Sequence, residues 1–441
     1  MPSELPVRII QDPSRGFTLL QGLTAPGPDV TVCFDLCGED RIRARLYGPG
    51  VPALKGTEHK VDLPVKATAV RAAAARLARL WKEVFVDHRP PSPDGRPAAG
   101  RPEQPYAELT DLSAEPLDEL GPVLDELAHS GCELLFGTLL NGEGYQVELF
   151  REFLAEALAE EGLRIRFDSD LFVPWTLMCL RPEDLPMPAA GGPAGLFERF
   201  LGYRHQIEQT GGSYPWLGDR PSPSVMPVVS LNHDTGIDRH RITRAAEVAA
   251  LLAQDTTFVE RTKGVELAAA LSDPALGDQL MYFWCHGTFR NDGPEPPALA
   301  VRLSDTRIVD AHLVQDKRRG LGKHTPFQPF VLLNACHAGV PAGEADRAFL
   351  GRALIEHGAR GVLGPQIEMP QVFAAEYAYG FLTRYLGGRE TAGRIAHALA
   401  REFADAYRNP LGLAYALHCG MDARLERITQ AATDQEQGIT V

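Results

Sequence analysis

Two stretches, QLMYFWC at residues 279–285 and PFVLLNA at residues 329–335, decide the fold of this chain of 441 residues. Each is a short, continuous run of aliphatic or aromatic residues. A strand of a parallel sheet is buried on both faces, so its sequence is apolar throughout rather than alternating between apolar and polar residues. We therefore expect two buried strands of a parallel sheet.

The sequence around these two stretches alternates between strand and helix patterns from residue 225 onward. Further strands are expected at 225–231, 256–260, 359–364 and 411–419. Helices are expected at about 243–253, 263–272, 346–358 (with Asp346 as N-cap and Gly358 as C-cap), 371–386 and 390–407. This alternation predicts an α/β fold in which a mostly parallel sheet carries helices on both faces.

The first half of the chain has its own strand and helix patterns. Strands are expected at 30–36, 41–48 and 162–168, and helices at 66–86 and near 115–129 and 146–160. A stretch rich in Pro and Gly at 88–105 is expected to be a linker or long loop. A second such stretch, at 185–224, marks the main boundary. We expect an accessory α/β region at 1–220 and a second domain at 225–441.

Composition narrows the class of protein. Hydrophobic residues make up 44% and charged residues 23% of a chain with a net charge of −14, which is typical of a globular protein. The acidic balance, without a stripe of Lys or Arg, argues against direct binding of nucleic acid. No apolar run is long enough to span a membrane, and the N-terminus does not resemble a secretory signal. Seven irregularly spaced cysteines favour a reducing, cytoplasmic location.

The two central strands end in residues that carry chemistry. His286 and Gly287 follow the first strand, and Cys336 follows the second. The carboxyl ends of strands in open α/β sheets line the functional crevice, so we expect a base and a thiol to meet there. A thiolate attacks a carbonyl, a histidine protonates the leaving amine, and backbone N–H groups stabilise the oxyanion. The N–H groups of Gly287 and Cys336 are the candidates for that last role.

The blocks MYFWCHG (281–287) and FVLLNACHAG (330–339) resemble the two signature blocks of CHAT peptidases. This is a caspase-like family that also resembles separases, gingipains and metacaspases. A histidine about 50 residues before the cysteine is typical of caspases. The resemblance extends over roughly 160–425. It also rests on the segments IRFDSDLFVPWTLM, FLGYRHQI, GRALIEHGARGVLGPQIEMP and NPLGLAYALHCGM.

This resemblance implies a caspase-like cysteine endopeptidase that cleaves peptide bonds through an acyl-enzyme on Cys336, with His286 as general acid/base and without a metal or cofactor. It implies a protein substrate, such as an effector encoded by a partner gene, and activity held back until an activating protein or signal acts. It also implies a role in bacterial, including antiviral, defence or cell death. The region 1–220 then corresponds to an accessory half, of which a pseudo-caspase half is one form.

Three further residues are candidates for the substrate pocket. The resemblance places Asp234, at the end of the strand before the catalytic pair, where a pocket residue can lie, and a carboxylate there favours Arg or Lys before the scissile bond. Glu368 is a second candidate. Asn334 stands where some relatives carry an aspartate. The alternative for Asp234 is a turn-forming residue next to Gly236, and for Glu368 a solvated loop charge.

Other readings of these residues stay open. Each of His286 and Cys336, taken alone, is more often structural than catalytic. Cys285–His286 and Cys336–His337 offer two cysteines and two histidines to zinc, but neighbouring residues on a strand point to opposite faces. A different class of function is a catalytically silent caspase-like module that binds a partner protein.

Overall fold

The computed structural model describes most of the chain. The described residues are 27–52, 59–90, 102–171, 173–185, 195, 197–211, 223–290, 298–305, 307–321, 325–335 and 350–428.

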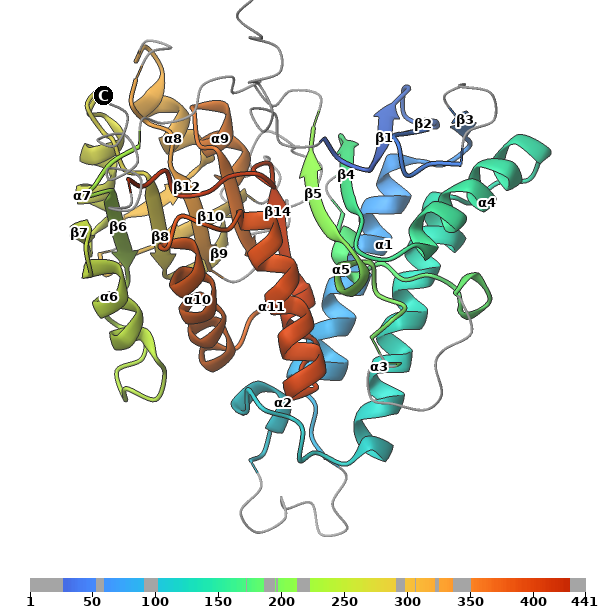
Figure 1. Ribbon diagram of the computed structural model, residues 1–441, viewed down its shortest axis with the longest axis horizontal. Coiled ribbons are helices and arrows are strands. Elements are labelled where there is room, and N and C mark those ends of the chain that lie inside the picture. The colour runs from blue at the N-terminus through green and yellow to red at the C-terminus, as the bar shows by residue number, and fades with distance from the viewer. Residues whose placement is uncertain are drawn as a thin grey trace, which may run out of the picture.

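One large mixed sheet runs through both halves of the chain (Figure 1). Its eleven strands lie in the order β3-β2-β1-β4-β5-β14-β13-β12-β8-β6-β7. The bounds of the first-half strands are β1 Val30–Leu36, β2 Ile42–Tyr47, β3 His59–Leu63, β4 Arg164–Ser169 and β5 Gln206–Thr210. Those of the second half are β6 Val228–His233, β7 Thr257–Arg261, β8 Leu280–Trp284, β12 Phe330–Asn334, β13 Gly361–Pro365 and β14 Tyr415–His418.

The two halves of the sheet run in opposite directions. Strands β1, β4, β5 and β14 are parallel to one another, and so are β13, β12, β8, β6 and β7. The reversal occurs between β13 and β14, which pair antiparallel. The last strand of the chain therefore closes the second half and also pairs with β5 of the first half. The carboxyl ends of the two halves face opposite edges of the molecule.

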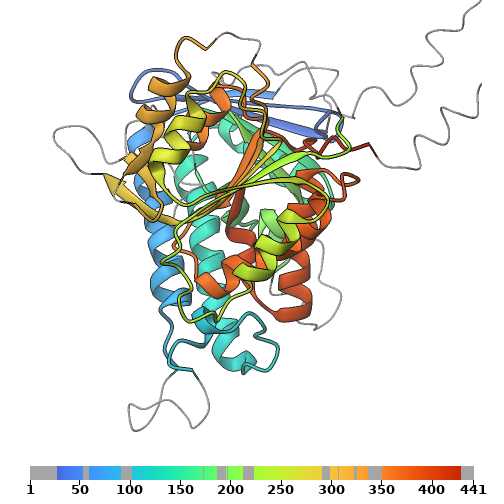
Figure 2. The same ribbon diagram turned by 90° about the vertical axis from the view of Figure 1, so that its left-hand side faces the viewer.

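Helices cover both faces of the second half of the sheet, and the side chains of its strands alternate between them. In β8, Leu280, Tyr282 and Trp284 join the core that includes residues of α6 (Ala245–Ala253), α10 (Gln371–Tyr385) and α11 (Ala392–Tyr407). Met281 and Phe283 join the core that includes residues of α7 (Gly264–Leu271), α8 (Ala311–Arg318) and α9 (Leu350–Glu356). Figure 2 shows the strands between these two groups of helices. This double burial explains why the strand sequences are apolar throughout.

The first half packs three longer helices against its strands (Figure 1). These are α1 (Ala67–Leu80), α3 (Leu117–Cys132) and α4 (Tyr145–Ala159). Two of them continue into π-helical turns, α1 into η1 (Trp81–Val86) and α3 into η2 (Glu133–Leu139). Short helices are α2 (Pro105–Glu108), η3 (Trp175–Leu177), η4 (Pro182–Asp184) and α5 (Leu201–Arg204).

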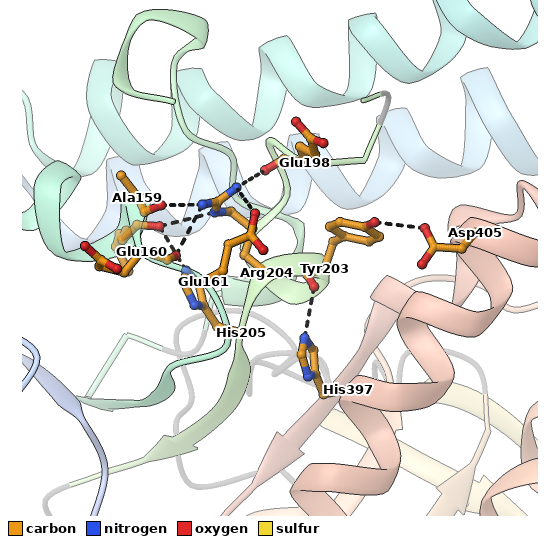
Figure 3. A network of polar contacts seen from close by, with 10 residues as sticks. Ala159, Glu160, Glu161, Glu198, Tyr203, Arg204, His205, His397 and Asp405 are labelled. Carbon is orange, nitrogen blue, oxygen red and sulfur yellow. Dashed lines mark hydrogen bonds and ion pairs between the residues drawn. The ribbon is translucent and has the colours of Figure 1, made fainter. Parts of the chain in front are cut away.

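The two halves are joined by a polar network as well as by the sheet (Figure 3). Arg204 donates to the carbonyl oxygens of Ala159 and of Glu160 (3.2 Å), at the end of α4. Its neighbour Tyr203 donates from its hydroxyl to Asp405 of α11 at 2.8 Å, and accepts at its carbonyl oxygen from Nε2 of His397 at 2.9 Å. This network therefore ties the end of α4 to α11 through α5.

The expected fold class is confirmed: the protein is α/β, with a large, mostly parallel sheet flanked by helices. The strand expected at 411–419 is shorter, because residues Pro410–Ala414 form a 3-10 helix (η7) before β14. Asp346, the expected N-cap, lies outside the described residues. The division at about 220–225 stays a prediction, and the large sheet is continuous across it.

A small second sheet is absent from the sequence-based expectations. It consists of β9 (His286–Arg290), β10 (Ala298–Arg302) and β11 (Ile308–Asp310), in the order β11-β10-β9 and antiparallel throughout. Strand β9 begins two residues after β8 ends, so the chain leaves the large sheet at Cys285 and enters the small one. The candidate base His286 stands at this transition.

Candidate functional site

The carboxyl ends of β6, β8 and β12 are in register at one edge of the sheet. Trp284 of β8 lies opposite His233 of β6 on one side and Asn334 of β12 on the other. The backbone continues this alignment, because the N–H of Asp234 donates to the carbonyl oxygen of Trp284 at 2.9 Å. The residues that follow these three strands therefore emerge side by side.

His286 is exposed at this edge, whereas the residue before it is buried. Cys285 is 4% exposed and packs in the core under α7, α8 and α9. His286 is the first residue of β9, and Gly287 pairs with Val301 of β10. The exposed position gives the imidazole of His286 access to solvent and to a bound molecule, as a general acid/base needs.

Cys336 and His337 lie outside the described residues. The strand that leads to them is described: β12 ends at Asn334, and Ala335 is 3% exposed. Trp284 and Asn334 are paired across the two strands. In the sequence, His286 comes two residues after Trp284, and Cys336 comes two residues after Asn334. The two chain segments that carry the candidate base and thiol thus leave the sheet from adjacent strands at the same level.

Asn334 is held inside the protein by three contacts. Its Nδ2 donates to the carbonyl oxygen of Ala374 in α10 at 2.7 Å and lies 3.5 Å from the hydroxyl of Tyr282. Its Oδ1 accepts from the hydroxyl of Tyr415 in β14 at 2.8 Å. The side chain is 4% exposed and fixes β12 against α10 and β14. The amide nitrogen and the amide oxygen of Asn334 thus both find hydrogen-bond partners inside the core.

Asp234 forms a turn and is half-buried. Its Oδ1 accepts the N–H of Gly236 at 2.8 Å, and its carbonyl oxygen accepts the N–H of Ile237 at 3.1 Å. The turn-forming role considered from the sequence is therefore present. It leaves the second carboxylate oxygen, Oδ2, without a hydrogen bond to any described residue, so a turn and a binding role are compatible.

Glu368 makes an ion pair that crosses between the halves of the chain. Its Oε2 lies 2.5 Å from Nζ of Lys82, which belongs to η1 at the end of α1. Both side chains are about two-fifths exposed, so the pair contributes little to stability. The main effect of the ion pair is that the positive charge of Lys82 compensates the negative charge of the Glu368 carboxylate. Nothing in the sequence around Lys82 distinguishes it from other helix lysines, so only the tertiary fold identifies this partner.

Most of the described cysteines lie in surroundings that make their thiols unreactive. Burial raises the pKa of the thiols of Cys33, Cys132, Cys179 and Cys419 above the ordinary value. A raised pKa reduces the thiolate fraction and hence the nucleophilicity at neutral pH. Cys37 is partly exposed. A thiol-directed electrophile is therefore expected to discriminate strongly among the cysteines of this chain.

Within the described part of the chain, no group of three or more His, Cys, Asp or Glu side chains is arranged to hold a metal ion. The zinc alternative needs Cys336 and His337, which lie outside that part. Cys285 and His286 face different surroundings, one buried and one exposed, as expected for adjacent residues of an extended chain. No described helix has both the length and the apolar character to cross a membrane.

Comparison with known proteins identifies the second half of the chain. The CHAT domain family matches residues 238–417, a region that starts just after β6 and ends within β14. Residues 238–417 thus resemble a CHAT domain. Both signature segments, with His286 and Cys336, fall inside the matched region.

The chain is also similar to a curated protein. A probable protease of Vitiosangium sp. (strain GDMCC 1.1324) is 26% identical over 199 residues, which cover 44% of this chain and 24% of the relative. The chain thus spans about a quarter of that relative's length.

Among solved structures, two crystal structures of the Saccharomyces cerevisiae separase–securin complex are similar to the protein. One matches with a TM-score of 0.40 at 8% identity, and the other with a TM-score of 0.38 at 9% identity. Each match covers 88% of this chain and 30% of the other chain.

Proposed function

We propose that the protein is a cysteine endopeptidase in which Cys336 is the nucleophile and His286 the general acid/base. The observation that carries this proposal is the parallel pairing of β8 with β12, in which Trp284 lies opposite Asn334. Each proposed catalytic residue is the second residue after one of these paired positions. The CHAT domain match and the likeness to a probable protease support the same reaction class.

In this reaction the Cys336 thiolate attacks the carbonyl carbon of the scissile peptide bond. The C–N bond breaks as protonated His286 gives its proton to the leaving amine, which leaves a thioester on Cys336. Water then attacks the thioester, His286 accepts the water's proton, and the acid product leaves. No step needs a metal or an organic cofactor.

The developing oxyanion requires N–H donors, for which we propose the backbone of Gly287 and Cys336. Strand β9 is the outer strand of the small sheet, paired on one side with β10. Alternate N–H groups of such an edge strand point away from its partner, so β9 has donors available next to His286. Such preorganised donors are commonly a large part of the rate enhancement in acyl transfer.

Substrates and regulation follow the family resemblance. We propose a protein substrate, with an effector encoded by a partner gene as one candidate. Activation by a second protein or a signal, in a bacterial defence pathway such as antiviral defence or cell death, belongs to the same proposal. A cytoplasmic location agrees with the use of a free thiol.

Labelling with a peptidyl acyloxymethyl ketone tests the mechanism. The wild-type protein is expected to take one label at Cys336, and Cys336→Ala is expected to take none. Cys37→Ala is the matched control, since it removes a partly exposed thiol elsewhere and should leave labelling unchanged. His286→Ala should reduce the labelling rate by about a hundredfold or more, because a paired histidine raises the thiolate fraction.

Equal labelling of the wild type and Cys336→Ala would contradict the mechanism. If the thiol is unreactive in the wild type and the protein still captures a partner, the chain acts as the catalytically silent binding module instead.

A further inference from the structure

A basic loop follows β6 and borders the candidate site. The segment DRHRI, residues 238–242, contains Arg239, His240 and Arg241, and all three are exposed. The loop begins close to the chain segment that carries His286. The N–H of Asp234 donates a hydrogen bond to the carbonyl oxygen of Trp284, and Trp284 is two residues before His286. The two arginines of the loop carry positive charge in a chain whose net charge is −14.

The acidic groups of this loop face inward and fix its shape. The carboxylate of Asp238 accepts the backbone N–H groups of Ile242 at 2.7 Å and Thr243 at 3.2 Å, and the hydroxyl of Thr243 at 2.7 Å. The N–H of Arg241 donates to the carbonyl oxygen of Asp238 at 2.9 Å. Asp238 therefore holds the loop backbone without neutralising the neighbouring guanidinium groups.

The cations of the loop are exposed and available to a ligand. Neither Arg239 nor Arg241 forms an ion pair with another residue in the described part of the chain. Arg244, three residues further on, differs: it pairs with Glu247 and Glu376 and lies over the ring of Tyr379. Arg244 is therefore held by contacts within the fold, whereas Arg239 and Arg241 are exposed in the loop that follows Asp234.

The loop backbone is strained where these side chains are presented. Asp238 has a φ of 58° and Arg241 a φ of 51°, both in the left-handed region that favours glycine. Such conformations persist where the surrounding contacts impose them, and they gather at functional sites. A loop that keeps arginine at a strained, exposed position is preorganised to present that side chain.

We propose that residues 238–242 form a recognition surface for an acidic segment of the protein substrate, within a few residues of the scissile bond. This inference rests on the proposed peptidase function and adds a substrate class to it. Two guanidinium groups and a histidine complement carboxylates, and the adjacent Ile242, 68% exposed, offers an apolar contact of the kind that peptides use. Nucleic acid is a poorer match, since a phosphate backbone needs a longer basic stripe.

Peptide binding tests the proposal without requiring turnover. The full chain carrying Cys336→Ala is titrated with a fluorescein-labelled peptide rich in glutamate, and with a matched peptide in which glutamine replaces each glutamate. We expect the glutamate peptide to bind more tightly and to lose affinity as salt is added. Adding Arg239→Glu and Arg241→Glu should weaken its binding by about tenfold, the effect of reversing two exposed charges.

A matched pair of charge reversals controls for net charge. Arg319 and Arg389 are exposed. Arg319 directly follows Arg318. The guanidinium of Arg318 lies over the ring of Phe327, and Phe327 is three residues before the start of β12. Arg389 directly follows Gly388, which packs near Leu425. Arg319→Glu with Arg389→Glu should leave binding within about twofold of the unchanged loop. Arg239→Gln with Arg241→Gln, which adds no repulsion, should lie between the two.

Equal binding of the glutamate and glutamine peptides would overturn the proposal. So would equal losses in the two charge-reversal pairs, or tighter binding of a single-stranded oligonucleotide than of the glutamate peptide. Because this assay reads binding and the labelling assay reads the Cys336 thiol, failure of one is distinguishable from failure of the other.

Discussion

Asp234 and Glu368 are the two carboxylates proposed to line the substrate pocket, and their surroundings differ. Asp234 shares one oxygen with a turn, while Glu368 is already paired with Lys82. Removing an existing ion-pair partner costs free energy, so a cationic substrate side chain gains more from Asp234 than from Glu368. We therefore propose that Asp234, rather than Glu368, would produce the expected preference for a basic residue before the scissile bond.

Asp234→Asn is expected to lower kcat/KM for substrates with Arg before the scissile bond by about tenfold or more, while Glu368→Gln has a smaller effect. The change keeps the side-chain oxygen that accepts the Gly236 N–H, so the turn is retained. A panel of fluorogenic peptides varied at that residue measures the effect. Unchanged Arg selectivity in Asp234→Asn, or a wild-type preference for acidic or apolar residues, would refute the assignment.

At the scale of the element, helix α4 depends on a side chain from another part of the sequence. Its last carbonyl groups have no partner within the helix, as at any helix end. Arg204 donates to three of the carbonyl oxygens around this end, those of Leu158, Ala159 and Glu160, and also to that of Glu198 (Figure 3). Its positive charge also opposes the negative end of the helix dipole.

Arg204→Met is expected to lower the free energy of unfolding by about 3 kcal/mol, because the buried guanidinium of Arg204 and its hydrogen bonds to four carbonyl oxygens are lost. Arg204→Lys is the matched variant: it keeps the charge but presents a single ammonium group, so an intermediate loss is expected. Urea unfolding followed by circular dichroism measures both. Equal stability of Arg204→Met and the wild type would show that these carbonyl groups find other donors.

At the scale of the whole molecule, the junction between the halves contains one buried histidine, His205, and one partly buried histidine, His397. His205 donates from Nε2 to the carbonyl oxygen of Leu158 at 3.0 Å, and His397 donates to that of Tyr203. Both line a small cavity between the halves, together with residues of η7 and β14. Burial lowers the pKa of His205 to about 3, and burial also lowers the pKa of His397.

The lowered pKa of His205 makes the folded state less stable in acid. The unfolded chain binds a proton near pH 6.5, but folded His205 does not until about pH 3. The stabilising contribution is therefore complete above about pH 6.5 and falls as the pH decreases toward 3. Between about pH 7.5 and 5 we expect a loss of about 2 kcal/mol in the free energy of unfolding from this group.

His205→Gln measures this effect. The variant retains an N–H donor but cannot be protonated, so its urea midpoint should change less between neutral and mildly acidic pH than that of the wild type. His240→Gln, which alters an exposed histidine, is the matched control and should keep the wild-type pH dependence. A pH slope in His205→Gln equal to that of the wild type would contradict the linkage.

The local sequence determined the elements with a clear apolar pattern, namely fully buried strands and helices with one buried face. The strands at β8 and β12 were predictable because both faces of a parallel strand need apolar residues, which gives a continuous run. Helices α1, α3, α4, α10 and α11 were predictable from apolar positions at helical spacing. The order of His286 before Cys336, each after a strand, indicated the candidate site, and the blocks around the two residues carried the resemblance to CHAT peptidases.

Only the tertiary structure decided the features that depend on pairing between distant segments. Strands β9 to β11 were missed because they are only three to five residues long and are held by pairing with one another. The reversal of sheet direction at β14 depends on which strands become neighbours, and a strand's own residues do not record that. The contacts of Lys82 with Glu368, and of Asn334 with Tyr415, join segments far apart in the chain, so the roles of these side chains arise from packing rather than from sequence neighbours.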